Sequence, residues 1–308
     1  MNAARQSPPR GALIFANADF DGLELRTLAQ VCIYMFGQSR LAEVLNSKDS
    51  RGRPMDPHLA MAANMLGIEY EEAARRKDAG DHAIDDARQA GKVANFGFPG
   101  GLGAEKLCLF ARKTYKVNLN EDQARELKRT WLATFPEFRR YFAAVNDMMQ
   151  PEGATFRHCV SNRIRGNVPY TATCNSFFQG LGADATGAVL FLVSESCYTP
   201  GACQWCEGVG CEWCGRSGVT PLYGTRLVNF IHDDYLIECP ESRGHEVAHT
   251  LVKIMQDGTR PYLPDVPATA KPQLSRYWSK DAKQVWIDDP AAPGGKGKRL
   301  VPWPKQAA

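Results

Sequence analysis

Residues 230–238 read FIHDDYLIE, and this stretch decides the fold. Two adjacent carboxylates, Asp233 and Asp234, separate two apolar segments that have the composition of short β-strands. Burying an unpaired carboxylate costs several kcal/mol, so these side chains do not belong inside a buried strand. The stretch predicts a β-hairpin with its acidic residues at the tight turn. Since aspartate is common in turns, a solvated turn without chemical function is one interpretation of this feature.

A second acidic site lies where an N-terminal apolar stretch ends. ALIFANADF (residues 12–20) predicts a short buried strand, with Asp19 and Asp21 at its end. Carboxylates from two strand ends of one sheet can meet and hold a divalent cation, because Mg²⁺ favours carboxylate oxygens and substrate phosphates. Two such ions about 4 Å apart can activate an attacking oxygen and stabilise a leaving oxygen in phosphoryl transfer.

A third feature is the segment DARQAGKVANFGF, in which Arg88, Lys92 and Phe96 recur every four residues. This spacing places the three side chains on one helical face. Two cations and an aromatic ring suit a triphosphate with a stacked base. The alternative is a solvated basic stripe with a phenylalanine in the core.

The rest of the chain predicts an α+β fold. Residues 22–37 have the apolar rhythm of a helix, residues 40–150 are rich in helical segments, and residues 171–197 predict a long, largely buried helix. Another helix is expected over residues 241–257. A few antiparallel strands therefore carry helices, and a helical insertion separates the first strand from the later hairpin.

Composition narrows the class of protein. The 308 residues are 44% hydrophobic and 23% charged, as in an ordinary globular protein, and the net charge of +3 says little about partners. No uninterrupted apolar run reaches the roughly 18 residues of a membrane span, so no membrane partner is expected. The N-terminus MNAARQSPPRG lacks the apolar core of a signal peptide, which predicts a cytoplasmic protein.

Four cysteines crowd into one short loop with the pattern CxxC, four residues, CxxC. Thiolates at this spacing can close a tetrahedral zinc site, and the intervening glycines permit tight turns. Free thiols or disulfides are the alternatives. Trp205 and Trp213 of this loop are candidate contacts for DNA or a partner, or they pack over the metal site. The expected ligands of one structural Zn²⁺ are Cys203, Cys206, Cys211 and Cys214.

The three acidic and basic features occur in a fixed order that resembles a known family. ADFDGLELRTLA resembles motif A of family A DNA polymerases, the bacterial DNA polymerase I type, RQAGKVANFG is similar to motif B, and IHDD is similar to motif C. DPHLAMAA and NSFFQGLGADA resemble two further segments of that family. The resemblance covers roughly residues 12–280, and the five segments occur in the family's order and spacing.

The resemblance implies roles for the carboxylates and for a set of DNA contacts. Asp19 and Asp233 would be ligands of two catalytic Mg²⁺ ions, and Asp234 would be a supporting catalytic acid. Motif C normally has glutamate where this chain has Asp234, which is one methylene shorter. The implied contacts to the primer–template duplex are Asn175, Gln179 and His232.

The resemblance also implies a site for the incoming deoxynucleoside triphosphate (dNTP). Glu24 matches the steric-gate position that excludes a ribose 2′-hydroxyl, although the pattern from Asp21 to Glu24 is also a helix capping box. Motif B usually ends in an aromatic residue where this chain has Gly100, and Pro99 predicts that the helix ends early. The other implied dNTP contacts are His58, Arg88, Lys92 and Phe96.

The implied architecture is an antiparallel palm sheet with a helical fingers subdomain and a small zinc-binding loop. Only 18 residues precede Asp19, so the thumb and exonuclease domains of this family are expected to be absent. The expected ranges are 1–30 (palm), 31–150 (fingers), 151–288 (palm), 199–220 (zinc insertion) and 289–308 (disordered tail).

The resulting hypothesis is a template-directed DNA polymerase that is the C-terminal catalytic part of a split or truncated enzyme, or a divergent minimal enzyme. Phage replication and bacterial repair are the alternative settings, and the compact, divergent form favours a phage. The expected partners are primer–template DNA, dNTPs and a separate thumb-bearing subunit. One alternative is a non-catalytic primer–template-binding subunit that keeps the palm fold. Another is a zinc adaptor protein, which accounts only for the cysteine loop.

Overall fold

The computed structural model describes residues 12–279, 281–289 and 297–304. Within them, internal contacts divide the chain into two compact units, and each is described by itself. The sheet unit comprises residues 12–23, 183–261 and 268–304 of the described chain. The helical unit comprises residues 24–182 and 262–267.

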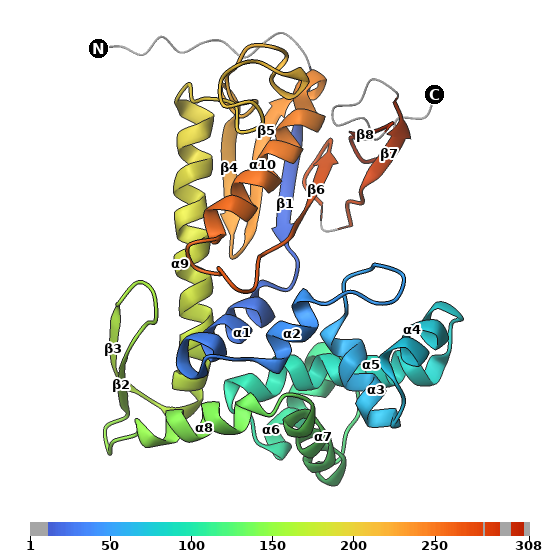
Figure 1. The fold of residues 1–308 in the computed structure, drawn as a ribbon, viewed down its shortest axis with the longest axis vertical. Coiled ribbons are helices and arrows are strands. Elements are labelled where there is room, and N and C mark those ends of the chain that lie inside the picture. Colours follow the sequence, from blue (N-terminus) through green and yellow to red (C-terminus); the bar gives the residue numbers. More distant parts are fainter. Residues whose placement is uncertain (1–11, 280, 290–296, 305–308) are drawn as a thin grey trace. The chain divides into compact units, whose positions relative to one another are not determined.

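The sheet unit is built on four antiparallel strands, which Figure 1 shows side by side. Their order is β4 (Arg226–Ile231), β5 (Asp234–Pro240), β1 (Leu13–Phe20) and β6 (Ala270–Ser275). Every second side chain of β1 from Ile14 to Phe20 is buried, because successive residues of a strand point to opposite faces. The predicted strand and hairpin are therefore both present and lie next to each other.

Two helices complete the core of the sheet unit. Helix α10 (Gly244–Thr259) packs against β1 and β6, and its first residue must be small because a Cβ there would lie 2.7 Å from the Ile14 Cδ1 atom. The C-terminal half of α9 (Tyr170–Tyr198) is fixed to β5 by the buried Tyr235, whose hydroxyl donates to the Thr186 carbonyl at 2.7 Å.

The helical unit has short helices joined by tight turns. Two of them begin at aspartate N-caps: Asp56 accepts from the His58 N–H, and Asp81 accepts from the Ala83 N–H. A two-stranded hairpin, β2 (Ala154–Arg157) and β3 (Ile164–Val168), precedes α9. The helices are α1 (Leu23–Phe36), α2 (Arg40–Asn46), α3 (Pro57–Leu66), α4 (Tyr70–Asp78), α5 (His82–Gly97), α6 (Ala104–Phe110), α7 (Glu121–Thr134) and α8 (Glu137–Asp147).

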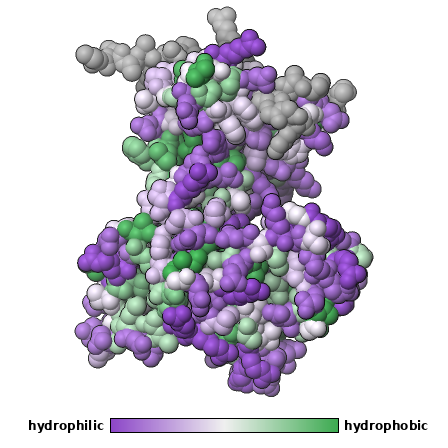
Figure 2. All heavy atoms as spheres, in the orientation of Figure 1, coloured by the Kyte–Doolittle hydropathy of each residue, from purple (hydrophilic) through white to green (hydrophobic). Residues whose placement is uncertain are grey.

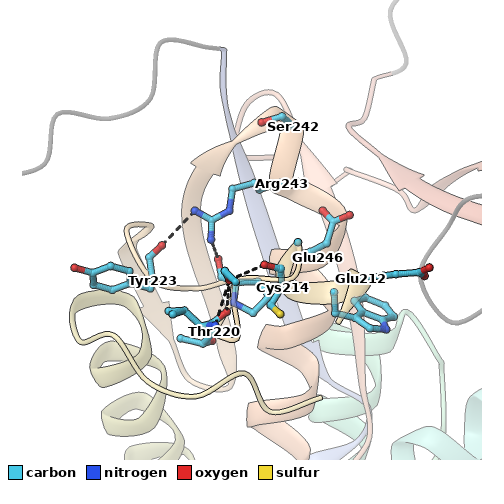
Figure 3. Close-up of a pocket in the computed structure, with 12 residues that line it drawn as sticks. Glu212, Cys214, Thr220, Tyr223, Ser242, Arg243 and Glu246 are labelled. Carbon is cyan, nitrogen blue, oxygen red and sulfur yellow. Dashed lines mark hydrogen bonds between the residues drawn. The ribbon is translucent and has the colours of Figure 1, made fainter. Parts of the chain in front are cut away.

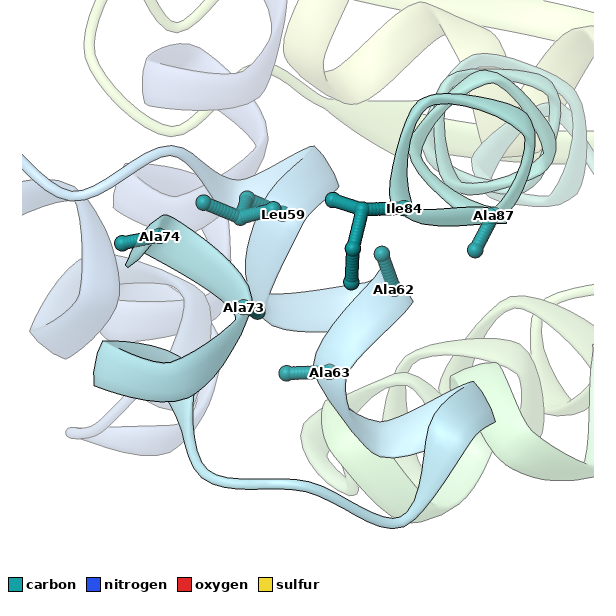
Figure 4. Packing of buried hydrophobic residues seen from close by; sticks show 7 residues of the cluster. All are labelled: Leu59, Ala62, Ala63, Ala73, Ala74, Ile84 and Ala87. Carbon is teal, nitrogen blue, oxygen red and sulfur yellow. The ribbon is translucent and has the colours of Figure 1, made fainter. Parts of the chain in front are cut away.

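Small side chains let α3, α4 and α5 approach closely (Figure 4). Gly91 of α5 contacts α3 so closely that a Cβ would lie 2.6 Å from the His58 carbonyl oxygen. This contact sets α5 directly against the start of α3, where His58 lies. The buried cluster between the three helices is Leu59, Ala62, Ala63, Ala73, Ala74, Ile84 and Ala87.

The predicted disordered tail over 289–308 is wrong in part. Residues 290–296 and 305–308 lie outside the described residues, but β8 (Lys298–Val301) pairs with β7 (Val285–Asp288). Leu300 explains the order, because its side chain is buried and its N–H donates to the His245 Nδ1 atom at 2.9 Å.

The boundaries of the two compact units differ from the domain boundaries expected from the sequence. The divisions follow Leu23 and Gly182 rather than residues 30 and 150. The first half of α9 belongs with the helices that precede it, as the hydrogen bond from the buried Tyr141 hydroxyl to the Cys174 carbonyl at 2.5 Å shows.

Helix α9 bears on the expectation that the chain has no membrane-spanning segment. Its 29 residues are long and apolar enough, by average hydropathy, to cross a membrane, whereas the sequence argument counted only uninterrupted apolar runs. Of its most apolar 18-residue window, 44% is buried in the protein, and the core helix of a soluble protein passes the same test. Hydrophobic patches on the face shown in Figure 2 are small and separated by hydrophilic side chains.

Candidate active site

Strand pairing in the sheet unit brings three carboxylates to one end of the sheet. Asp19 near the end of β1 stands opposite Asp234 at the start of β5. His232 and Asp233 form a two-residue turn between the paired residues Ile231 and Asp234, and His232 has a φ of 59°. The turn directs Asp233 toward Asp19, and the two side chains share a hydrogen bond.

Burial and neighbouring carboxylates shift the pKa values of Asp19 and Asp234. Partial burial raises the pKa of Asp19 and the charge of Asp21 adds to the shift, whereas the Phe20 N–H and the hydrogen bond with Asp233 oppose it. Burial and the charge of Asp19 raise the pKa of Asp234 to about 6, although a hydrogen bond from the Asn17 side-chain amide lowers it. Both groups therefore hold protons more tightly than an isolated carboxyl.

This excess of negative charge fits a divalent cation. A hard cation would take the carboxylate oxygens and offset the burial and the neighbouring negative charge that raise both pKa values. The cation on the adjacent strand, Lys271, is bound to Asp21 at 2.7 Å. The solvated-turn interpretation does not explain why Asp233 bonds to a carboxyl of another strand.

The helical unit gathers a histidine and two cations at the start of α3. Burial and the charges of Arg88 and Lys92 together lower the pKa of His58 to about 4, against the opposing charge of Asp56. The imidazole is therefore neutral at neutral pH. The Asn95 amide lies 3.0 Å from His58 Nδ1, and because Trp131 donates to the Asn95 oxygen, the amide nitrogen faces the ring. This network assigns the imidazole proton to Nε2.

The two cations of the predicted stripe differ in their partners. Arg88 Nε donates to Asp56 at 2.6 Å, so its charge is largely balanced within the protein. Lys92 has no hydrogen-bond or ion-pair partner among the described residues. Lys92 is therefore the cation that remains available to an anionic ligand.

A row of rings connects this site to Glu24. Phe96 lies 5.3 Å from the His58 ring and is stacked on Tyr115 at 6.5 Å. Burial raises the pKa of Tyr115, and the charge of Glu24 raises it further. Glu24 in turn accepts from the Gln179 amide at 2.7 Å. The sequence analysis missed Tyr115, because it lies in a short π-helical turn (Ala111–Tyr115) that carries no apolar periodicity.

Two further predicted residues have definite positions. As predicted, α5 ends early, at Gly97, and a 3₁₀ turn follows over Phe98–Gly100. Asn175 of α9 lies against that turn, so closely that a Cβ on Gly100 would be 2.7 Å from the amide nitrogen. A side chain in place of Gly100 would therefore have to displace the Asn175 amide.

The four cysteines of the predicted zinc loop lie together. Their sulfur atoms are all within 4.8 Å of one another. In the described part of the chain, no other group of three or more histidine, cysteine, aspartate or glutamate side chains brings its ligand atoms together in this way. Burial acts to raise the pKa of Cys214, but backbone N–H groups of Cys211 and Gly218 lower it to about 6. Gly210 N–H likewise donates to Cys206 Sγ at 3.1 Å. Four convergent sulfurs with N–H donors fit a tetrahedral zinc ion.

The cysteine loop is anchored to α10 by aromatic stacking. Trp213 stacks on Trp205 at 4.6 Å and on His245 at 5.6 Å. Arg243 fixes the end of the loop by donating to the Tyr223 carbonyl at 3.3 Å, beside a cavity of about 550 Å³ (Figure 3). Trp213 thus packs within the protein, whereas the Trp205 side chain remains 40% exposed.

Comparison with known proteins identifies the family. The model for DNA polymerase family A matches residues 4–280. The chain belongs to DNA polymerase family A. Among curated proteins, this family A chain is similar to DNA polymerase I of Aquifex aeolicus (strain VF5), with 24% identity over 87% of the present chain. It is also similar to the DNA polymerase of Bacillus phage SP01, with 23% identity over 90% of the present chain.

The family A chain spans 39% of the Aquifex protein and 27% of the phage protein. Among solved structures, it resembles the POL domain of Pol1 from M. smegmatis, in a complex with DNA primer-template and dNTP. The TM-score is 0.61 at 19% identity, covering 88% of this chain and 41% of that one. The mixed fold, with its antiparallel sheet and helices, is therefore similar to a polymerase domain.

The first prediction concerns Asp234 in metal-free protein. Its carboxyl should titrate near pH 6, followed by NMR chemical shifts of the carboxyl carbon. Because the folded-state pKa is raised, this group stabilises the fold below about pH 4, and that contribution is lost as pH rises through about 6. Asn17→Ala should raise the pKa further by removing the amide donor, whereas Asn229→Ala on β4 should leave it unchanged. Titration near pH 4 in the unsubstituted protein would contradict the arrangement.

Proposed function

We propose that this chain is a template-directed DNA polymerase that adds dNTPs to a primer 3′-hydroxyl with two Mg²⁺ ions. The observation that carries the proposal is the direct contact between Asp19 and Asp233 in a member of family A. The sheet unit corresponds to the palm and the helical unit to the fingers. The complex of the Pol1 structural relative with primer–template DNA and dNTP supports the same substrates here.

The carboxylates would serve as metal ligands. The ions, when bound, lower the pKa of the primer hydroxyl and neutralise charge on the phosphates. Asp19 and Asp233 would hold them, because their side chains already meet and the charge of Asp21 adds negative potential beside them. Asp234 is held by Asn17 and is a supporting acid. The rigid antiparallel flanks keep all three in place without a ligand.

The helical unit would bind the triphosphate of the dNTP. Lys92 supplies an uncompensated cation, and the neutral His58 donates its Nε2–H to a phosphate oxygen. Arg88 retains donors beyond the one that Asp56 accepts. Phe96, fixed between the rings of His58 and Tyr115, offers its surface to the sugar and base.

Glu24 would act as the steric gate against a ribose 2′-hydroxyl. The Gln179 amide holds its carboxylate, so the gate has a fixed position before the nucleotide binds. On the DNA side, His232 at the turn would contact the primer terminus, and Asn175 and Gln179 would contact the minor groove of the duplex.

The cysteine loop would bind one structural Zn²⁺ through Cys203, Cys206, Cys211 and Cys214. The convergence of the four sulfur atoms supports this assignment. The ion would hold together an insertion too short to build an apolar core of its own, and Trp213 would transmit that order to α10.

The catalytic proposal predicts that Asp233→Asn abolishes primer extension. A neutral amide replaces an anionic Mg²⁺ ligand, so incorporation should fall by more than about 100-fold. The assay measures single-nucleotide addition with Mg²⁺, and Asp288→Asn, an exposed residue of β7, is the matched control. Incorporation by Asp233→Asn at the control's rate would reject this chemistry and leave a DNA-binding role.

The gate proposal predicts that Glu24→Ala increases ribonucleotide incorporation relative to dNTP by about tenfold or more, because the sugar pocket gains room. Glu24→Gln keeps the side-chain volume and should keep the discrimination. Competition between ribo- and deoxynucleotides at one template position measures both variants. Unchanged discrimination in Glu24→Ala would leave this residue only a helix-capping role.

The zinc proposal predicts one zinc per chain in protein purified under reducing conditions, measured by elemental analysis. Cys206→Ser should lower the zinc content and the melting temperature, because a tetrahedral site loses a thiolate ligand. The exposed Cys159, outside the loop, provides the control variant Cys159→Ser. Protein without zinc but with four intact thiols would refute the assignment.

A further inference from the structure

The β2–β3 hairpin of the helical unit carries positive charge in a stretch that lies between Glu152 and Asp184. Residues 153–183 contain no aspartate or glutamate, but they contain Arg157, Arg163 and Arg165. All three side chains are exposed, and so is Ile164, at 62%. The resemblance to family motifs did not involve this hairpin, and no role has been given to it above.

The hairpin lies along the first half of α9, as Figure 1 shows and the contacts establish. Phe156 packs on Phe177, with ring centroids 4.4 Å apart. Arg165 donates to the Ser176 hydroxyl at 2.6 Å, and Arg163 donates to the Gly180 carbonyl at 3.4 Å.

The spacing of these contacts shows that β3 and α9 are in register. Two residues of a strand span about 6.6 Å, and four residues of a helix rise about 6 Å. Arg163 and Arg165 therefore meet successive turns of α9. The residues directly before Ser176 and Gly180 are Asn175 and Gln179, so the arginines flank the two amides proposed to contact the duplex groove.

Arg157 and Arg165 keep their full charge, because their partners are neutral. Arg157 donates to the Asn162 carbonyl at 3.1 Å and Arg165 to a serine hydroxyl, and among the described residues neither has an ion-pair partner. Arg112, Arg139 and Arg140 of the same unit likewise form no ion pair among the described residues. The arginines of this unit that pair with carboxylates are Arg40, Arg51, Arg53, Arg75, Arg76, Arg88, Arg125 and Arg129.

We propose that the β2–β3 hairpin is a phosphate-binding element that holds the backbone of duplex DNA beside α9 through Arg157 and Arg165. The planar guanidinium presents paired donors that match phosphate oxygens. Phosphate contacts fix the position of a protein on the duplex, and amide side chains contact the base edges. The hairpin would therefore set the register in which Asn175 and Gln179 meet the groove. This inference rests on the proposed function, because it takes primer–template DNA as the ligand.

Salt dependence of binding tests the hairpin separately from catalysis. The logarithm of the binding constant falls with the logarithm of salt concentration by about 0.9 for each phosphate contact. The double variant Arg157→Gln/Arg165→Gln should therefore lower the slope by about 1.8 for a duplex with a template overhang. Fluorescence anisotropy of labelled DNA with the full chain measures the slope.

Two controls distinguish charge from folding. Arg165→Lys keeps the charge and should keep most of the slope, and Arg129→Gln on α7, an arginine that pairs with Glu126, should leave it unchanged. A double variant with the slope of the unsubstituted chain would overturn the hairpin assignment, whatever the Asp233→Asn assay shows. If Asp233→Asn loses incorporation while the double variant keeps the slope, the polymerase proposal stands and the role of the hairpin is rejected.

Discussion

The constraint on which the candidate site depends is the antiparallel pairing of β1 with β5. This pairing sets Asp19 opposite Asp234, and the two-residue turn before β5 adds Asp233. Separated carboxylates would be more stable, so the sheet must hold them against their repulsion. The buried alternate residues of β1 and the buried Tyr235 and Ile237 of β5 provide that rigidity. The negative charge is thereby concentrated where a cation can relieve it.

A single carboxylate organises the helical unit in a comparable way. The Asp56 carboxylate caps α3 by accepting from the His58 N–H, and it forms an ion pair with Arg88. The Asp56 backbone N–H donates to the Tyr70 hydroxyl. The close approach at Gly91 presses α5 onto the same turn. Together these contacts bury the His58 ring and keep it neutral, which lets a histidine surrounded by cations act as a hydrogen-bond donor.

The sequence predicted those parts of the fold that local chemistry determines. Apolar stretches next to carboxylates located β1 and β5, the four-residue spacing located the face of α5, and Pro99 marked the end of that helix. Long-range packing accounts for the failures. Tyr115 joins the ring row only because α6 and the turn after it fold back toward Phe96, and β8 is ordered because Leu300 finds a buried place beside His245.

The same difference between local and long-range structure applies to the two predicted metal sites. Spacing alone brought Cys203, Cys206, Cys211 and Cys214 together, because their separation along the chain is small. The carboxylates, in contrast, are more than 200 residues apart. Their places at two strand ends allowed them to meet, and the order of the family motifs indicated that they do. Internal ion pairs such as Arg88 with Asp56 left no trace in the sequence pattern.

The hydrogen bond between Glu24 and Gln179 couples two properties that are usually treated as separate. It joins the residue proposed to select the sugar to a residue proposed to contact the groove. A substitution at either position changes the orientation of the other. Variants selected to accept modified sugars should therefore also differ in how they tolerate a mismatched primer end, and the two traits should evolve together.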